Sequence, residues 1–97
     1  MKTREEVLRI LREAKKDLGV RYHITRVALF GSYARAEQQE EGDIDILVDV
    51  EPSIGLRFVA LANELEKLLG QRVELVTSRA ISSKLKPLVE SESIEVA

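Results

Sequence analysis

The chain has 97 residues, with 15 Lys and Arg against 17 Asp and Glu, a formal net charge of -2 and no cysteine. This charge argues against a general nucleic-acid binder, because such proteins carry a basic stripe that follows the phosphate backbone. Without cysteine, disulfides, zinc–thiolate sites and thiol nucleophiles are excluded. No apolar run reaches the length of a membrane span and the N-terminus lacks the apolar region of a signal peptide, so we expect a cytoplasmic protein without a membrane partner.

The chain opens with an amphipathic pattern that predicts a helix over 3–18. Thr3 and Glu6 have the spacing of a capping box, and Gly19 suits the C-terminal cap. The apolar positions recur with a helical period and are expected to face the core: Val7, Leu8, Leu11, Ala14 and Leu18. His23, the only histidine, is interpreted as a surface residue of the following connector.

An apolar run predicts a strand over 25–30, and this strand ends at Gly31 and Ser32. Glycine permits a tight turn out of the strand, and a short helix is expected over 32–37. The first N–H groups of such a helix point at an anion, and the Ser32 hydroxyl adds a further donor. The turn therefore suits a phosphate group.

Arg35 lies one turn into this short helix. It either contacts a phosphate or pairs with a nearby acid, and pairing is slightly favoured; the acids in reach are Glu37 and Glu41. The polar run over 37–42 is expected to form a loop beside the turn.

The next apolar run predicts a strand over 43–50 that begins with two carboxylates. Because side chains alternate between the faces of a strand, Asp43 and Asp45 project from one face and the aliphatic side chains from the other. Mg²⁺ takes one or two carboxylates and completes its shell with water and substrate phosphates, so this pair is a candidate metal site. Asp49 has the same phase but lies near the exit of the strand, and a surface role is expected for it.

Each half of this pattern has an ordinary structural explanation. A Gly-Ser pair after a strand is most often a turn with a helix cap, and an isolated Asp-x-Asp is most often a solvated edge or turn. Their order and spacing together favour a functional site, because packing does not require acids at both positions of an otherwise aliphatic strand.

A second long helix is expected to begin at 54 or 56 and to run to 69, where Gly70 ends it. Its apolar stripe is expected to be core: Phe58, Leu61, Ala62, Leu65, Leu68 and Leu69.

A third strand is predicted over 72–77, and Glu74 interrupts its apolar pattern. If Val73 and Leu75 face the helices, Glu74 projects onto the face that carries the two aspartates. The alternative is an exposed Glu on the open face of a one-sided sheet.

After a polar connector over 78–83, Pro87 predicts a last helix that begins shortly before it and ends at about Glu92. Leu85, Leu88 and Val89 are expected to face inward, and 94–96 to add a short edge strand. The whole pattern predicts an α+β fold, a single domain over 1–97 with a small mixed sheet of three to four strands and helices mainly on one face.

Two stretches carry a resemblance to a known family: Gly31-Ser32-Tyr33-Ala34-Arg35 and Gly42-Asp43-Ile44-Asp45-Ile46. They resemble the two-part signature of the DNA polymerase beta-like nucleotidyltransferase superfamily, specifically of its minimal nucleotidyltransferase (MNT) proteins. The resemblance covers nearly the whole chain. Three positions depart from the family pattern, because Ala36 stands where the family usually has Gly, Gly42 where it usually has Ser, and Glu74 where it usually has Asp.

The resemblance implies roles for six residues. One or two Mg²⁺ ions would be held by three acids that are also the catalytic residues, namely Asp43, Asp45 and Glu74. The phosphates of the nucleoside triphosphate would be held by Gly31, Ser32 and Arg35. In this scheme Glu74 either helps to bind the second ion or activates the acceptor hydroxyl.

The resemblance further implies a Mg²⁺-dependent enzyme that transfers a nucleoside monophosphate, AMP from ATP, to an acceptor hydroxyl. MNT proteins are often encoded beside a HEPN-domain toxin and act as its antitoxin, in some cases by transferring AMP to a toxin tyrosine. The alternative is a binding module with a weak or inactive nucleotide site, which neutralises its partner by masking it. Charge and size disfavour a subunit that modifies nucleic-acid ends, and the acceptor, the preferred base and the oligomeric state are left open.

Overall fold

The computed structural model describes residues 2–38 and 42–96, and Glu41, named above as a partner for Arg35, lies outside them. The elements follow in the order α1 (Arg4–Arg21), β1 (Arg26–Phe30), α2 (Gly31–Ala34), β2 (Ile44–Asp49), α3 (Arg57–Leu69), β3 (Val73–Val76), α4 (Lys86–Glu92) and β4 (Ile94–Glu95). Short 3₁₀ turns lie at Pro52–Ile54 and Ser78–Ala80. None of the helices in this described part is long and apolar enough to cross a membrane.

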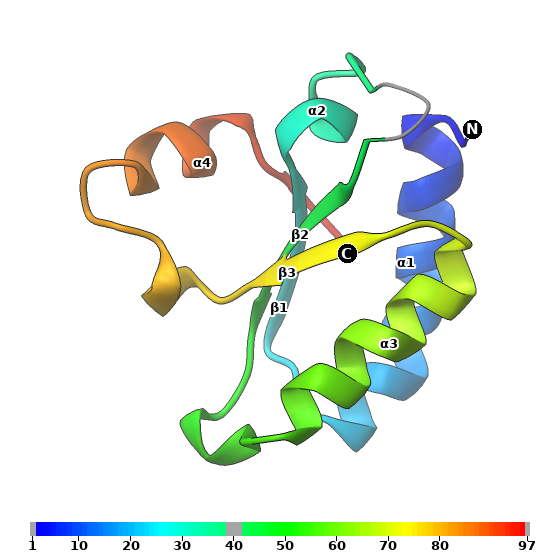
Figure 1. Cartoon of the computed structure of the whole chain (residues 1–97), viewed down its shortest axis with the longest axis vertical. Helices are drawn as coiled ribbons and strands as arrows, with labels where there is room; N and C mark the ends of the chain where they lie inside the picture. The colour runs from blue at the N-terminus through cyan, green and yellow to red at the C-terminus, as the bar shows by residue number, and fades with distance from the viewer. Residues whose placement is uncertain (1, 39–41, 97) are drawn as a thin grey trace.

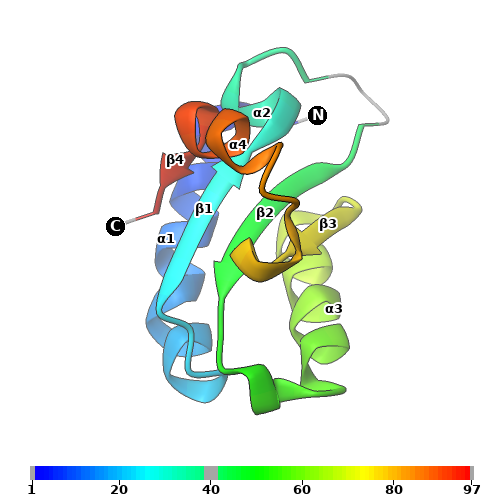
Figure 2. The same cartoon turned by 90° about the vertical axis from the view of Figure 1, so that its left-hand side faces the viewer.

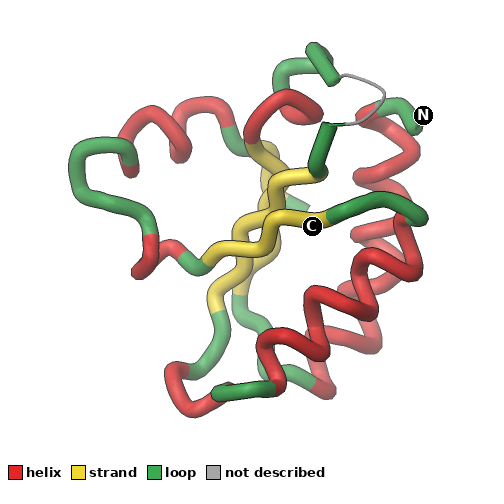
Figure 3. The backbone as a smooth tube through the Cα atoms, viewed as in Figure 1, coloured by secondary structure: helices red, strands yellow, loops and turns green. Residues whose placement is uncertain are grey.

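The strands form one mixed sheet in the order β3-β2-β1-β4. β1 runs antiparallel to both of its neighbours, whereas β2 and β3 are parallel. The chain therefore crosses from β2 to β3 through α3, and the helices lie on either side of the central strands (Figure 3). The predicted α+β fold with a small mixed sheet is confirmed.

Two long helices, α1 and α3, cover one face of the sheet (Figure 1). Alternate aliphatic side chains of β1 and β2 pack against these helices, and Leu29, Ile44 and Ile46 among them are completely buried. From the helices the core receives Val7, Leu11, Leu18, Leu61, Leu65 and Leu69. Since burying one such side chain contributes about 1.5–3 kcal/mol, this interface supplies most of the hydrophobic stabilisation.

The opposite face of the sheet is partly covered by α4 and the segment that leads into it (Figure 2). Ala28 and Leu47 are fully buried on this face, outside the core formed with α1 and α3. Arg26 on β1 holds α4 here, because its guanidinium donates to both carboxylate oxygens of Glu90 at 3.0 and 2.9 Å. The end of α4 is thereby fixed beside the turn that follows β1.

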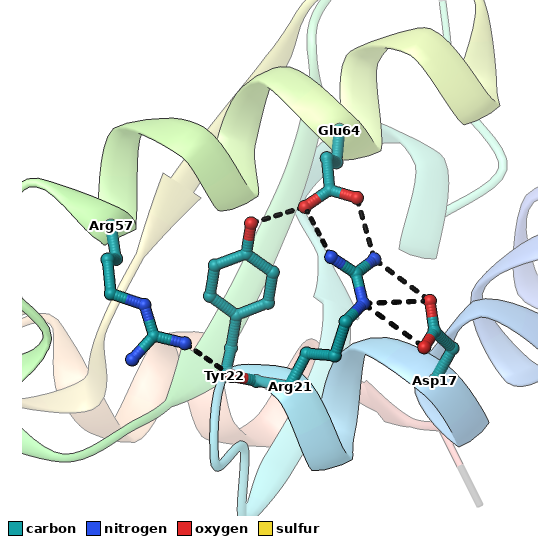
Figure 4. Close-up of polar contacts among 5 residues, drawn as sticks. All are labelled: Asp17, Arg21, Tyr22, Arg57 and Glu64. Carbon is teal, nitrogen blue, oxygen red and sulfur yellow. Dashed lines mark hydrogen bonds and ion pairs between the residues drawn. The ribbon is translucent and has the colours of Figure 1, made fainter.

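The capping box predicted at the start of α1 is confirmed, because Thr3 and Glu6 exchange side-chain and backbone hydrogen bonds. The predicted end at Gly19 is wrong, since α1 continues to Arg21. Arg21 pairs with Asp17 one turn earlier and with Glu64 on α3, at 2.8 and 2.7 Å (Figure 4). These contacts hold the last turn of α1 against α3, so a single glycine does not end the helix.

Three leucines that were expected to face inward are exposed. Leu68, Leu85 and Leu88 have exposed fractions of 50%, 55% and 60%. Leu68 lies on the flank of the α3 stripe, where α1 does not cover it, and α4 has only seven residues and is held by charged pairs. Val89 is the only one of the expected α4 residues that is partly buried.

The helix α2 ends at Ala34, earlier than predicted, and the chain then turns through Ala36 with φ 58°. Glycine adopts this left-handed conformation freely, whereas alanine pays about 1–2 kcal/mol for it. We therefore expect Ala36→Gly to raise the free energy of unfolding by about 0.5–1 kcal/mol, after the larger chain entropy of glycine in the unfolded state is subtracted. Urea unfolding measures the change, with Ala34→Gly in α2 as a destabilised control; a loss of stability in both variants would contradict this explanation.

Candidate active site

The turn at the end of β1 lies in direct contact with Asp45 of β2. Gly31 has φ +72°, and a Cβ atom placed on it would lie 2.1 Å from Oδ2 of Asp45. A side chain at this position would force the carboxylate of Asp45 to move, whereas glycine lets the backbone approach it closely. The contact brings the first residue of α2 to the proposed metal ligand.

Asp45 and Glu74 are neighbours across two parallel strands. The register pairs Asp45 with Glu74, and paired residues of adjacent strands project from the same face. Val73 and Leu75 pack against the core on the other face. The alternation of β3 therefore carries Glu74 to the face of the aspartates, which is the placement that the sequence pattern predicted.

The electrostatics of this face are those of an acidic cluster. Burial, and then the carboxylates of Glu74 and Asp43, raise the pKa of Asp45 to about 6, while Arg35 opposes the shift. A carboxylate surrounded by other carboxylates is stabilised by a cation that lies between them. Oxygen ligands of this kind match Mg²⁺, so the donor set fits a hard divalent ion.

Asp43 precedes β2, which begins at Ile44 and thus one residue later than predicted. Its Oδ1 lies 3.8 Å from Nε of Arg72, in a pair whose side chains are 40% and 86% exposed. Within residues 2–38 and 42–96, no group of three His, Cys, Asp or Glu side chains is arranged to hold a metal ion. Glu74 and Asp43 are both close enough to raise the pKa of Asp45, so the three acids form a cluster although they are not arranged as a complete ligand set.

Arg35 forms the pair with Glu37 that was considered above, at 3.5 Å, and a closer one with Glu92 of α4, at 2.9 Å. The other oxygen of Glu92 accepts a hydrogen bond from the backbone N–H of Gly31 at 3.3 Å. Glu92 was not predicted as a site residue, because it lies far along the chain and its position depends on how α4 packs. Its carboxylate accepts from both the Gly31 N–H and the Arg35 guanidinium.

Tyr33 fixes the turn from the other side. Its side chain is fully buried, and its hydroxyl accepts a hydrogen bond from Nε2 of Gln71 at 2.8 Å. Gln71 lies between α3 and β3, close to the start of the strand that carries Glu74. This hydrogen bond joins the turn to the segment that leads into β3.

Comparisons with known proteins agree with this arrangement. The family model of the nucleotidyltransferase domain matches residues 6–96. Protein adenylyltransferase MntA of Thermococcus cleftensis is 43% identical over 98 residues, which cover 99% of this chain and 98% of the relative.

Two solved structures share the fold. One, described as a "putative minimal nucleotidyltransferase", has a TM-score of 0.81 and 39% identity, covering 96% of this chain and 95% of the other. A toxin–antitoxin crystal structure with AMP-PNP has a TM-score of 0.69 and 27% identity, covering 89% and 72%. The chain therefore belongs to the nucleotidyltransferase domain family, as one of its minimal nucleotidyltransferase enzymes.

Proposed function

We propose that this enzyme transfers AMP from ATP to a hydroxyl group of a partner protein, a HEPN-domain toxin, and so acts as an antitoxin. The relative from Thermococcus cleftensis is named a protein adenylyltransferase, and a structural neighbour is a toxin–antitoxin complex with AMP-PNP. The HEPN partner follows from the resemblance to MNT proteins. Mg²⁺ is proposed as the ion because the donor set consists of carboxylate oxygens.

The contact between Gly31 and Asp45 carries this proposal. The turn is bare backbone where it meets the carboxylate, and Glu74 lies beside Asp45 on the next strand. Phosphates held by the turn and an ion held by Asp45 would therefore be immediate neighbours. Nucleotidyl transfer needs this juxtaposition, because the charge of the triphosphate must be neutralised where the reaction occurs.

In the proposed reaction the oxygen of the acceptor hydroxyl forms a bond to the α-phosphorus of ATP. The bond from this phosphorus to the oxygen bridging to the β-phosphate breaks, and pyrophosphate leaves. Gly31, Ser32 and Arg35 orient the phosphates, while Asp43, Asp45 and Glu74 hold the ion. When bound, Mg²⁺ supplies stabilisation of the entering and leaving oxygens.

Two roles stay open for Glu74, whose side chain is exposed at the edge of the cluster. It either completes the ligands of a second ion or accepts the proton of the hydroxyl. Either role uses the position next to Asp45, and neither requires Glu74 to be buried.

Labelled ATP tests the proposed function. The purified chain, Mg²⁺ and a HEPN-domain partner are incubated with ATP labelled at the α- or the γ-phosphate, and label on protein is followed. We expect the α-label on the partner, no γ-label, and no label with Asp43→Asn. Transfer of the γ-label instead would show phosphoryl transfer and overturn the proposal.

A masking module is the second candidate, and the position of Glu92 favours it. The carboxylate of Glu92 occupies a backbone donor and the guanidinium that the first proposal assigns to phosphate. A masking module would bind its partner with equal affinity with and without ATP and Mg²⁺. Asp43→Asn and Asp45→Asn would leave its neutralisation of the partner unchanged, whereas an enzyme would lose it.

A further inference from the structure

Glu92 lies where the proposed function places phosphate. One of its carboxylate oxygens accepts from the Gly31 N–H at 3.3 Å, and the other pairs with Nη1 of Arg35 at 2.9 Å. A carboxylate bridging a backbone N–H and a guanidinium satisfies these donors as a phosphate oxygen would. Glu92 is partly shielded, with a side-chain exposed fraction of 20% against 44% for Arg35.

The donors cannot serve both anions fully. A backbone N–H makes one good hydrogen bond, so a phosphate oxygen at Gly31 replaces the carboxylate rather than joining it. Arg35 has further donors, but its attraction for phosphate is reduced while Glu92 neutralises it. Arg35 is also close enough to the acidic cluster to lower the pKa of Asp45, so a phosphate bound to Arg35 would lie near that cluster.

We infer that Glu92 is a competing anion at the phosphate site: it occupies the Gly31 N–H and Arg35 in the nucleotide-free protein, and the triphosphate displaces it. This inference rests on the proposed function for the location of the phosphates. Its consequence is that nucleotide binding separates the end of α4 from the turn. Because Glu92 must first leave the site, the apparent affinity for phosphate is the intrinsic affinity multiplied by the fraction of molecules in which the site is open.

The test is Glu92→Gln, which keeps the size of the side chain and removes its charge. Titration calorimetry with Mg²⁺ measures binding of ATP and, separately, of inorganic tripolyphosphate. We expect both to bind about three- to tenfold more tightly to Glu92→Gln than to the unaltered protein. An unchanged or weaker affinity for both ligands would overturn the inference, and a weaker one would assign Glu92 to positioning Arg35.

Glu13→Gln is the matched control, because it removes the same charge from an exposed position of α1 that does not hold α4 in place. Glu13 pairs with Lys16 on the same helix at 3.4 Å, away from Gly31 and Arg35 in the hydrogen bonds of the described residues. If the control variant gained as much affinity as Glu92→Gln, the effect would come from net charge alone and the inference would be overturned. Circular dichroism melts establish that both variants are folded.

Tripolyphosphate separates this inference from the proposed function. It carries no adenosine and no transferable AMP, so its binding reports only the anion site. Tighter binding by Glu92→Gln without AMP transfer by the unaltered chain would refute the proposed function alone. Normal AMP transfer with unchanged phosphate affinity in Glu92→Gln would refute the inference alone.

Discussion

Replacing Asp45 with Asn should lower the rate of AMP transfer by about 10²–10³-fold or more. Asn keeps the shape of the side chain but removes the charge that would hold the ion against the turn, and loss of one such electrostatic interaction costs about 3–4 kcal/mol in the transition state. Transfer of labelled AMP to the partner measures the rate. Asp49→Asn is the matched control, because Asp49 lies on the same strand and binds the backbone N–H of Ser78 at 3.3 Å.

Asp45→Asn should still fold, because the substitution removes the repulsion between Asp45 and the carboxylates of Glu74 and Asp43. Full retention of AMP transfer by Asp45→Asn would contradict the assignment of the acidic cluster as the catalytic centre. A loss of transfer in Asp49→Asn that equals the loss in Asp45→Asn would also contradict it.

The same substitution should stabilise the metal-free protein at neutral pH. Burial and the neighbouring carboxylates raise the pKa of Asp45 to about 6, above its value in the unfolded chain, so ionisation above this pKa opposes folding. The penalty grows as pH rises from about 4 to about 6 and is absent below about 4, where Asp45 is protonated in both states. Asp45→Asn should therefore gain about 1–2 kcal/mol at pH 8, after solvent screening of a partly exposed group.

Urea unfolding with a chelator measures this gain at pH 8 and at pH 4. The difference in the free energy of unfolding between the variant and the unaltered protein should nearly vanish at the lower pH. An equal difference at both values would mean that the charge of Asp45 is not its source.

Gly31→Ala is expected to have the largest effect on stability. The added Cβ would lie 2.1 Å from Oδ2 of Asp45, and φ +72° is unfavourable for alanine. Strain of the backbone contributes about 1–2 kcal/mol and displacement of the carboxylate about 1–3 kcal/mol more, so about 2–5 kcal/mol should be lost. AMP transfer should also be lost at temperatures where the variant is folded, because the turn and Asp45 can no longer touch.

Gly19→Ala serves as the matched control for this glycine. Gly19 lies inside α1, and a Cβ there would meet only Cγ of Lys15 at 3.9 Å, an ordinary contact. Alanine favours the helix, so this variant should be about 0.5–1 kcal/mol more stable than the unaltered protein. If Gly31→Ala were tolerated as well as Gly19→Ala, the close contact between the turn and Asp45 would be refuted.

Local patterns predicted much of the site. The alternation of side chains along two strands was sufficient to carry Asp45 and Glu74 to one face, because their aliphatic neighbours must face the core. The capping box at Thr3 and the left-handed cap at Gly70 were also predictable, since both depend on residues within one turn. These features follow from the chain itself.

Features that depend on packing between distant segments were not predictable. Glu92 meets Arg35 because α4 packs over the sheet, where Arg26 also binds Glu90. The extension of α1 beyond Gly19 similarly depends on α3, which supplies Glu64. Periodicity alone does not show which flank of a helix is left uncovered, and it therefore assigned the exposed leucines to the core.

Intact-protein mass spectrometry of the HEPN-domain partner shows whether the chain transfers AMP to it. The partner is incubated with ATP and Mg²⁺ together with the unaltered chain, Asp45→Asn or Asp49→Asn. We expect the partner to gain the mass of one or more AMP groups with the unaltered chain and Asp49→Asn, and none with Asp45→Asn. A stable complex in which the partner is neutralised but keeps its original mass would contradict it and establish the masking module.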